Sequence, residues 1–144
     1  MKVLFLDIDG VLLPFDADTP GCTGPDEHFP RSAVSALNEL TTQTGCKIVL
    51  TSTWRCIECI DVPAIFKEEG ISGEIIGGTP TVGARAEEIA AWLAAVSEPV
   101  ESFAIIDDFD RGLSLAFPGR FVKTDPLRGL TEEETVKAAR ILNT

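Results

Sequence analysis

Basic residues are scarce in this chain of 144 residues. Lys and Arg number 12 against 23 Asp and Glu, so the formal net charge at pH 7 is -11. Such a surplus of negative charge repels extended polyanions. We therefore expect no extended duplex binding, although a small phosphorylated group can still bind where a metal ion or a positive charge is local.

Long apolar runs are also absent. The apolar start at residues 3–6 is broken by Asp7 and Asp9, and no run approaches the roughly 18 to 20 residues that span a bilayer. We expect no signal peptide, no membrane partner and a cytoplasmic protein, in which the four cysteines are reduced. Cys56 and Cys59 form a CxxC pair without a second pair downstream, so free thiols are a better interpretation than a zinc or redox site.

The chain has neither an internal repeat nor a linker, and 44% of its residues are hydrophobic. These features predict a single domain over residues 1–144 with a core of its own. Residues 14–30, rich in Pro and Gly, are expected to form a surface loop near the site. Short apolar runs alternate with segments of helical periodicity, which predicts strands at residues 2–6, 47–50, 73–76, 102–106 and 121–122 and helices at 31–44, 60–69, 85–96 and 131–142.

The last of these helices has two further expected features. Thr131 and Glu134 have the spacing of a capping box at its start. Val136, Ala139 and Leu142 fall on the face that we expect to point inward.

Five strands that alternate with helices predict an α/β fold, in which a parallel five-stranded sheet carries helices on both faces. Ligands of such sheets bind outside the carboxyl ends of the strands. Polar residues follow three of the predicted strands at this point. They are Asp7 and Asp9 after the first strand, Thr51 and Ser52 after the second, and Asp107 and Asp108 after the fourth.

Carboxylates gathered at one edge need a cation. Asp7 and Asp9 leave the first strand on the same side, and Gly10 allows a tight turn beside them. A hard ion such as Mg²⁺ takes oxygen ligands and keeps water molecules that a substrate phosphate can replace. Asp7 together with Asp108 or Asp107 is therefore the candidate metal site, and without a metal these acids would shift each other's pKa strongly.

Four segments, in this order, resemble the motifs of the haloacid dehalogenase (HAD) superfamily. They are the DxDG motif at residues 5–12, the strand ending in Thr or Ser at 48–52, Arg85 in place of the third motif's Lys or Arg, and the DD form of the fourth motif at 104–108. A closer resemblance is to the HAD domain of Swiss Army knife RNA repair proteins. Its matching segments are residues 51–55, 78–80, 124–126 and 129–131, together with Arg85, Glu88, Ile89, Trp92 and Leu93.

The resemblance implies a three-layer, Rossmann-like HAD fold and a Mg²⁺-dependent phosphomonoester hydrolase. Asp7 would attack phosphorus and form an aspartyl-phosphate, and Asp9 would serve as general acid and base. Thr51 would hold a phosphoryl oxygen, and Arg85 would supply fixed positive charge. The metal ligands would be Asp7, Asp108 or Asp107, and the backbone carbonyl of Asp9.

Several assignments stay open at this point. Thr51 is preferred to Ser52, and Asp108 to Asp107, which could instead orient Arg85; Asp110 is a third acid within reach. Candidate substrate contacts are Ser52, Gly10 and Arg55. Arg55 could bind a nucleobase or second phosphate beside Trp54, or Trp54 could be a core residue while Arg55 pairs with an acid.

No insertion between the motifs is long enough for a cap domain, so the expected site is open to a phosphate on a bulky substrate. Nucleotides or phosphorylated nucleic-acid ends are the expected substrates, and the protein is expected to be a monomer or a homodimer. Two alternatives are a catalytically inactive HAD fold that binds phosphate and metal, and a signalling receiver. The receiver is disfavoured because it carries its phosphoacceptor at the third strand.

Overall fold

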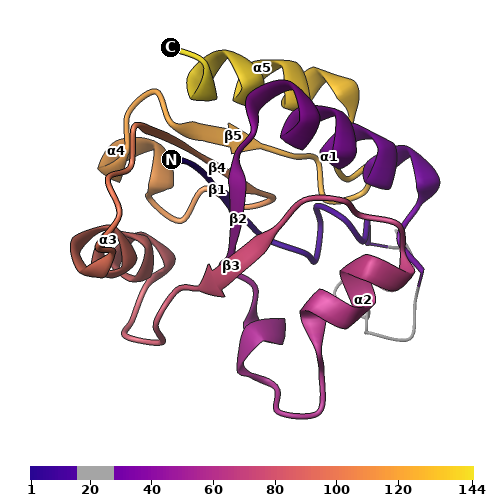
Figure 1. The fold of residues 1–144 in the computed structure, drawn as a ribbon, viewed down its shortest axis with the longest axis horizontal. Coiled ribbons are helices and arrows are strands. Elements are labelled where there is room, and N and C mark those ends of the chain that lie inside the picture. Colours follow the sequence, from indigo (N-terminus) through magenta and orange to yellow (C-terminus); the bar gives the residue numbers. More distant parts are fainter. Residues whose placement is uncertain (16–27) are drawn as a thin grey trace.

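The computed structural model describes residues 1–15 and 28–144, and its five strands form one parallel sheet in the order β3-β2-β1-β4-β5 (Figure 1). The strands are β1 (Lys2–Leu6), β2 (Lys47–Leu50), β3 (Ile75–Gly78), β4 (Ser102–Asp107) and β5 (Phe121–Lys123). The helices are α1 (Arg31–Thr44), the 3₁₀ helix η1 (Thr53–Cys56), α2 (Val62–Glu68), α3 (Arg85–Ala95), α4 (Leu113–Ala116) and α5 (Glu132–Leu142). The expected α/β fold is confirmed, and its strand order differs from the order 2-1-3-4-5 of receiver proteins.

Alternate residues of β1 pack into two separate cores because successive strand side chains point to opposite faces. Leu4 and Leu6 belong to the core beneath α1 and α5, which lie side by side along the top of Figure 1. Val3 and Phe5 belong to the core on the other face, with Ile89 of α3 and Leu113 of α4. Apolar side chains on both faces explain why the strands are continuous apolar runs.

β3 begins two residues later than expected and ends in two glycines. Gly77 and Gly78, which lie beyond the expected range of 73–76, pair with Val49 and Leu50 of β2 and are part of the ladder. A Cβ on Gly78 would lie 3.0 Å from Cδ of Arg55, so the missing side chain leaves room for that arginine.

The expectations for α5 are partly wrong. Leu142 is buried and Ala139 packs against the core as expected, but Val136 is 42% exposed, and Thr135 and Ala138 are buried in its place. The hydroxyl of Thr131 donates a hydrogen bond to the Glu134 carboxylate and does not cap a backbone N–H.

The connections leave the carboxyl end of the sheet open. Only η1 and α2 lie between β2 and β3, and 144 residues leave little room for a cap domain. Most of the loop expected at residues 14–30 lies outside the described residues, as does Cys22. No helix within residues 1–15 and 28–144 is both long and apolar enough to cross a membrane.

Candidate active site

The predicted polar residues lie at the carboxyl ends of three neighbouring strands. Asp7 follows β1 and Thr51 follows β2, and their backbone N–H groups continue the ladder to Ile106 O at 3.1 Å and Leu6 O at 3.0 Å. Asp107 is the last residue of β4, directly beside β1 in the sheet. The ladder therefore places these three side chains on adjacent strands at one edge.

Three carboxylates form a cluster at this edge. One oxygen each of Asp7, Asp107 and Asp108 lies within 4.8 Å of the others. Burial, followed by the negative charge of Asp107, raises the pKa of Asp7 to about 8. Burial and the contact with Asp107 raise the pKa of Asp108 to about 6. The cluster carries more negative charge than its surroundings stabilise, which is the environment that a bound divalent cation would relieve.

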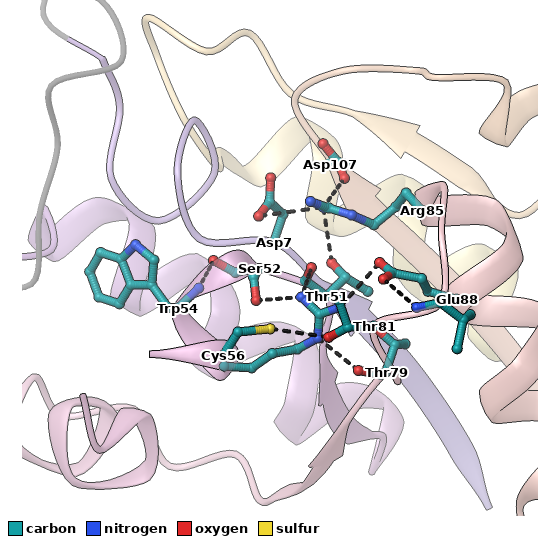
Figure 2. Close-up of polar contacts among 12 residues, drawn as sticks. Asp7, Thr51, Ser52, Trp54, Cys56, Thr79, Thr81, Arg85, Glu88 and Asp107 are labelled. Atoms are coloured by element: carbon teal, nitrogen blue, oxygen red, sulfur yellow. Dashed lines mark hydrogen bonds and ion pairs between the residues drawn. The ribbon is translucent and has the colours of Figure 1, made fainter. Parts of the chain in front are cut away.

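Arg85, the first residue of α3, points its guanidinium into this cluster (Figure 2). Its Nη1 lies 2.6 Å from Asp107 Oδ2, 3.6 Å from Asp7 Oδ1 and 3.4 Å from the hydroxyl of Thr51. Among the described residues every polar contact of Arg85 uses Nη1, so Nε and Nη2 can donate to a ligand. Arg85 can therefore bind an anion without giving up its place in the protein.

Asp107 and Asp108 differ in what their carboxylates already bind. Asp107 is fully buried, with Oδ2 on Arg85 and Oδ1 accepting the backbone N–H of Phe109 at 3.1 Å. Asp108 is only partly buried and lines the pocket beside Asp7. This arrangement favours Asp108 as the metal ligand and Asp107 as the residue that orients Arg85.

The two hydroxyls after β2 also differ. Thr51 Oγ1 lies at Arg85, whereas Ser52 Oγ accepts the backbone N–H of Trp54 at 3.2 Å and caps η1. Thr51 is thus the hydroxyl that faces the cluster, and Ser52 orders the turn that follows it.

Asp9 and Gly10 shape the first turn of the site. The indole N–H of Trp54 donates to Asp9 Oδ2 at 3.2 Å, which ties this carboxylate to η1. Gly10 has φ +79°, and a Cβ there would lie 2.5 Å from Asp108 Oδ2. Only a glycine both adopts this conformation easily and leaves space for the Asp108 carboxylate.

Arg55 does not lie in this pocket. Its guanidinium donates to the carbonyls of Thr51, Ser52 and Thr79 at 2.8 to 2.9 Å and pairs with Glu88 at 3.1 Å. Trp54 is buried. Of the two interpretations of this segment, the geometry therefore favours the structural one, in which Trp54 packs in the core and Arg55 pairs with an acid.

A pocket of about 260 Å³ opens over the cluster. Of the predicted residues, Asp7, Asp9, Arg85 and Asp108 line it. Four further lining residues were missed by the sequence reasoning, namely Phe15, Thr53, Phe109 and Arg111. Phe109 directly follows the acidic pair, Arg111 comes two residues later, and Thr53 follows the Thr-Ser pair, so closeness in sequence to a motif was the available signal.

Two other candidates lie elsewhere. Asp110 accepts hydrogen bonds from the backbone N–H and the hydroxyl of Ser114 in α4, so both oxygens of its carboxylate are used there, and it is not part of the carboxylate cluster. Cys46 is buried, whereas Cys56 and Cys59 are exposed, and all three are free thiols.

Comparison with known proteins agrees with this geometry. A family model described as the HAD domain in Swiss Army Knife RNA repair proteins matches residues 3–135, which includes every residue of the cluster. No curated protein matches the chain. The match supports a HAD-type phosphatase in general, and the open α/β fold with an acidic cluster at the end of its sheet is consistent with it. The chain belongs to the family of HAD domains found in Swiss Army Knife RNA repair proteins.

Proposed function

We propose that the protein is a Mg²⁺-dependent phosphomonoester hydrolase that works through an aspartyl-phosphate on Asp7. The observation that carries this proposal is the pocket in which a nucleophilic carboxylate, a second acid and a ligand-accessible arginine meet: Asp7, Asp108 and Arg85 all line it. A carboxylate alone repels a phosphate dianion, whereas a carboxylate beside a cation and an arginine can attack it.

The chain offers a suitable set of ligands for Mg²⁺. The Asp7 and Asp108 carboxylates and the backbone carbonyl of Asp9 would hold the ion, because these three residues line the pocket and Mg²⁺ prefers oxygen ligands. Mg²⁺ supplies positive charge that keeps Asp7 ionised at neutral pH and offsets the charge of the phosphate. The raised pKa of Asp7 supports this requirement, because the neutral carboxyl is a poor nucleophile.

In the first step Asp7 forms a bond to phosphorus while the bond from phosphorus to the leaving oxygen breaks. Asp9 donates its proton to that oxygen, so the leaving group departs as a neutral alcohol. Arg85 Nε and Nη2 and the hydroxyl of Thr51 hold the phosphoryl oxygens. The ion pair to Asp107 fixes the guanidinium in advance, so the charge is in place when the transition state forms.

In the second step water attacks phosphorus and the acyl-phosphate bond to Asp7 breaks. Asp9, now a carboxylate, takes a proton from the water, so Asp7 is released as a carboxylate, Asp9 is protonated again, and inorganic phosphate leaves. The hydrogen bond from Trp54 keeps Asp9 in one position during both steps. Its role as acid and base therefore depends on η1 as well as on the first turn.

The open pocket favours a phosphate at the end of a bulky substrate, and we propose nucleotides or nucleic-acid ends. Gly10 and Ser52 would contribute through the shape of the turns that they hold. Arg55 is not part of this proposal, because its donors are used within the protein.

The test is release of inorganic phosphate, with and without Mg²⁺, from p-nitrophenyl phosphate, mononucleotides and end-phosphorylated oligonucleotides. We expect Mg²⁺-dependent turnover that Asp7→Asn lowers by about 1,000-fold or more. The matched control is Asp61→Asn, because Asp61 caps α2 outside the site and Asn is an equally good cap. Turnover that persists in Asp7→Asn would contradict the mechanism, and tight Mg²⁺ and ligand binding without product would favour an inactive binding module.

A further inference from the structure

One wall of the pocket differs in chemistry from the acidic cluster. Phe109 follows the acidic pair directly, and its side chain lines the pocket while 61% of the residue stays exposed. The Arg111 guanidinium lies 5.5 Å from the centre of the Phe109 ring, within cation–π distance, and lines the same pocket. An aromatic ring and a cation therefore stand together beside the proposed nucleophile.

The turn that presents this pair is held on both sides. Phe109 N–H donates to Asp107 Oδ1 at 3.1 Å, and Asp110 binds Ser114 through both carboxylate oxygens. Arg111 has φ +50°, the one positive φ of a non-glycine residue in the described part of the chain. Positive φ is unfavourable for arginine, and such strain concentrates at functional sites.

Arg111 also differs in its partners from Arg85 and Arg55. Arg85 and Arg55 each pair with a carboxylate, whereas within residues 1–15 and 28–144 Arg111 has the Phe109 ring as its partner and no carboxylate. A pocket arginine that has no acidic partner among the described residues is available to an anionic ligand. The ring beside it offers a flat apolar surface to a planar group.

We propose that Phe109 and Arg111 form the subsite for the leaving group, an inference that rests on the proposed phosphatase function. The Phe109 face stacks on an aromatic base, and Arg111 pairs with a second anionic group on the same leaving group. The substrate chemistry is thus a phosphomonoester of a nucleoside that carries a further phosphate or phosphodiester. A nucleoside bisphosphate and a phosphorylated nucleic-acid end share this chemistry.

The test compares kcat/KM and calorimetric binding, with Mg²⁺ present, for four probes: ribose 5-phosphate, adenosine 5′-monophosphate, adenosine 3′,5′-bisphosphate and a 5′-phosphorylated adenine dinucleotide. Phe109→Leu should lower kcat/KM for every adenine probe by about 5-fold or more, as loss of base stacking does, and leave ribose 5-phosphate within about twofold. Arg111→Gln should lower kcat/KM by about 3- to 5-fold, and only for the two probes with a second anionic group.

Two control substitutions match these changes outside the pocket. Leu115→Ala removes an apolar side chain that is 85% exposed on α4, and Arg140→Gln removes one positive charge from α5. Neither should change the preference among probes. A preference for the dinucleotide over the bisphosphate identifies a nucleic-acid end as the source of the chemistry, and the reverse identifies a nucleotide.

The inference is overturned if Phe109→Leu lowers turnover of ribose 5-phosphate as much as that of the adenine probes, or if the wild type shows no preference for adenine. Release of phosphate from no probe at all would contradict the phosphatase function instead. In that case binding alone tests the subsite: tighter binding of adenine probes that Phe109→Leu removes supports it, and equal binding of all probes overturns it.

Discussion

Arg85 and Arg55 both contact Thr51 at the carboxyl end of β2, and both side chains are nearly buried. The charges that surround them differ. Arg85 faces Asp7 and Asp107, with Asp108 close by, so negative charge remains in excess. Arg55 faces Glu88 and three backbone carbonyls, so one charge balances the other and the remaining donors are used. A bound cation would offset the excess negative charge beside Arg85, whereas the paired charges around Arg55 stabilise the protein itself.

The Arg55 contacts connect the segments that carry the proposed catalytic groups. They join the carbonyls of Thr51, Ser52 and Thr79, and Glu88 also accepts the N–H of Val82 ahead of α3 at 3.2 Å. The ends of β2 and β3 and the start of α3 are thereby held together. Arg55 is therefore a positioning residue at most, and the following substitutions compare it with Arg85.

The largest expected effect is on turnover in Arg85→Met. The substitution removes the fixed charge that faces the phosphoryl oxygens, and phosphoryl transfer loses about 1,000-fold or more when such an arginine is absent. With Mg²⁺ present, we expect a smaller loss of folding stability than in the Arg55 variant, because the ion offsets the missing charge. Steady-state phosphate release and urea unfolding measure the two quantities. Turnover within tenfold of the wild type would remove Arg85 from the mechanism.

In Arg55→Met the expected damage is to stability. Glu88 would be left as a buried carboxylate without its partner, which costs about 3 to 5 kcal/mol in the free energy of unfolding. Turnover per folded molecule should fall by less than tenfold. Arg55→Lys keeps the charge but cannot reach all the carbonyls, so we expect roughly half that loss. Normal urea unfolding together with lost turnover would show that Arg55 contacts substrate.

The metal-free protein should lose stability as the pH rises from about 4 to 8. The folded state keeps the Asp7 proton up to pH 8, whereas the unfolded chain loses it near the ordinary value of 3.8, so folding becomes less favourable by up to about 1.4 kcal/mol per pH unit. Asp108 acts in the same direction up to about pH 6. Urea midpoints in EDTA measure the effect.

Asp7→Asn is the matched comparison for this pH dependence. The variant should equal the wild type near pH 4 and exceed it in stability near pH 8, because it has no carboxylate to ionise at that position. Mg²⁺ should reduce the difference at pH 8 by stabilising the wild-type carboxylate. If the two proteins lose stability in parallel up to pH 8, burial of Asp7 is not the source of the trend.

The two arginines also illustrate which parts of the site could be predicted from the sequence. Asp7, Thr51 and Asp107 were found because each follows a run of buried apolar residues, and parallel strands bring such ends together. The contacts of Arg55 depend on the path of η1, a four-residue helix without periodicity. The same holds for α4, which was also missed, and for the turn that carries Phe109 and Arg111.

Element boundaries follow the same logic. The bounds of β1, α1 and β2 agree with expectation because residues with clear local signals flank them, such as Gly45, which ends α1 in a left-handed conformation. Gly78 misled because it is part of the β3 ladder and the space that it leaves is used by Arg55, a side chain distant in sequence. Val136 misled because the packing of α5 against α1, β4 and β5 decides which of its side chains are buried, and helical periodicity alone does not give that orientation.

The smallest expected effect is that of Gly10→Ala. Comparison with a second glycine of positive φ separates the effect of backbone strain from that of contact with the cluster. Gly10→Ala places a methyl group against the Asp108 carboxylate at φ +79°, so we expect a loss of about 1 to 2 kcal/mol in stability and about tenfold weaker Mg²⁺ binding. Gly45→Ala is the control, since its φ is +69° and no atom lies within 4 Å of the added methyl. Gly45→Ala should lower the free energy of unfolding by a similar amount and leave the affinity for Mg²⁺ unchanged. Calorimetric titration of Mg²⁺ distinguishes the two, and equal affinities would mean that Asp108 is not a ligand of the ion.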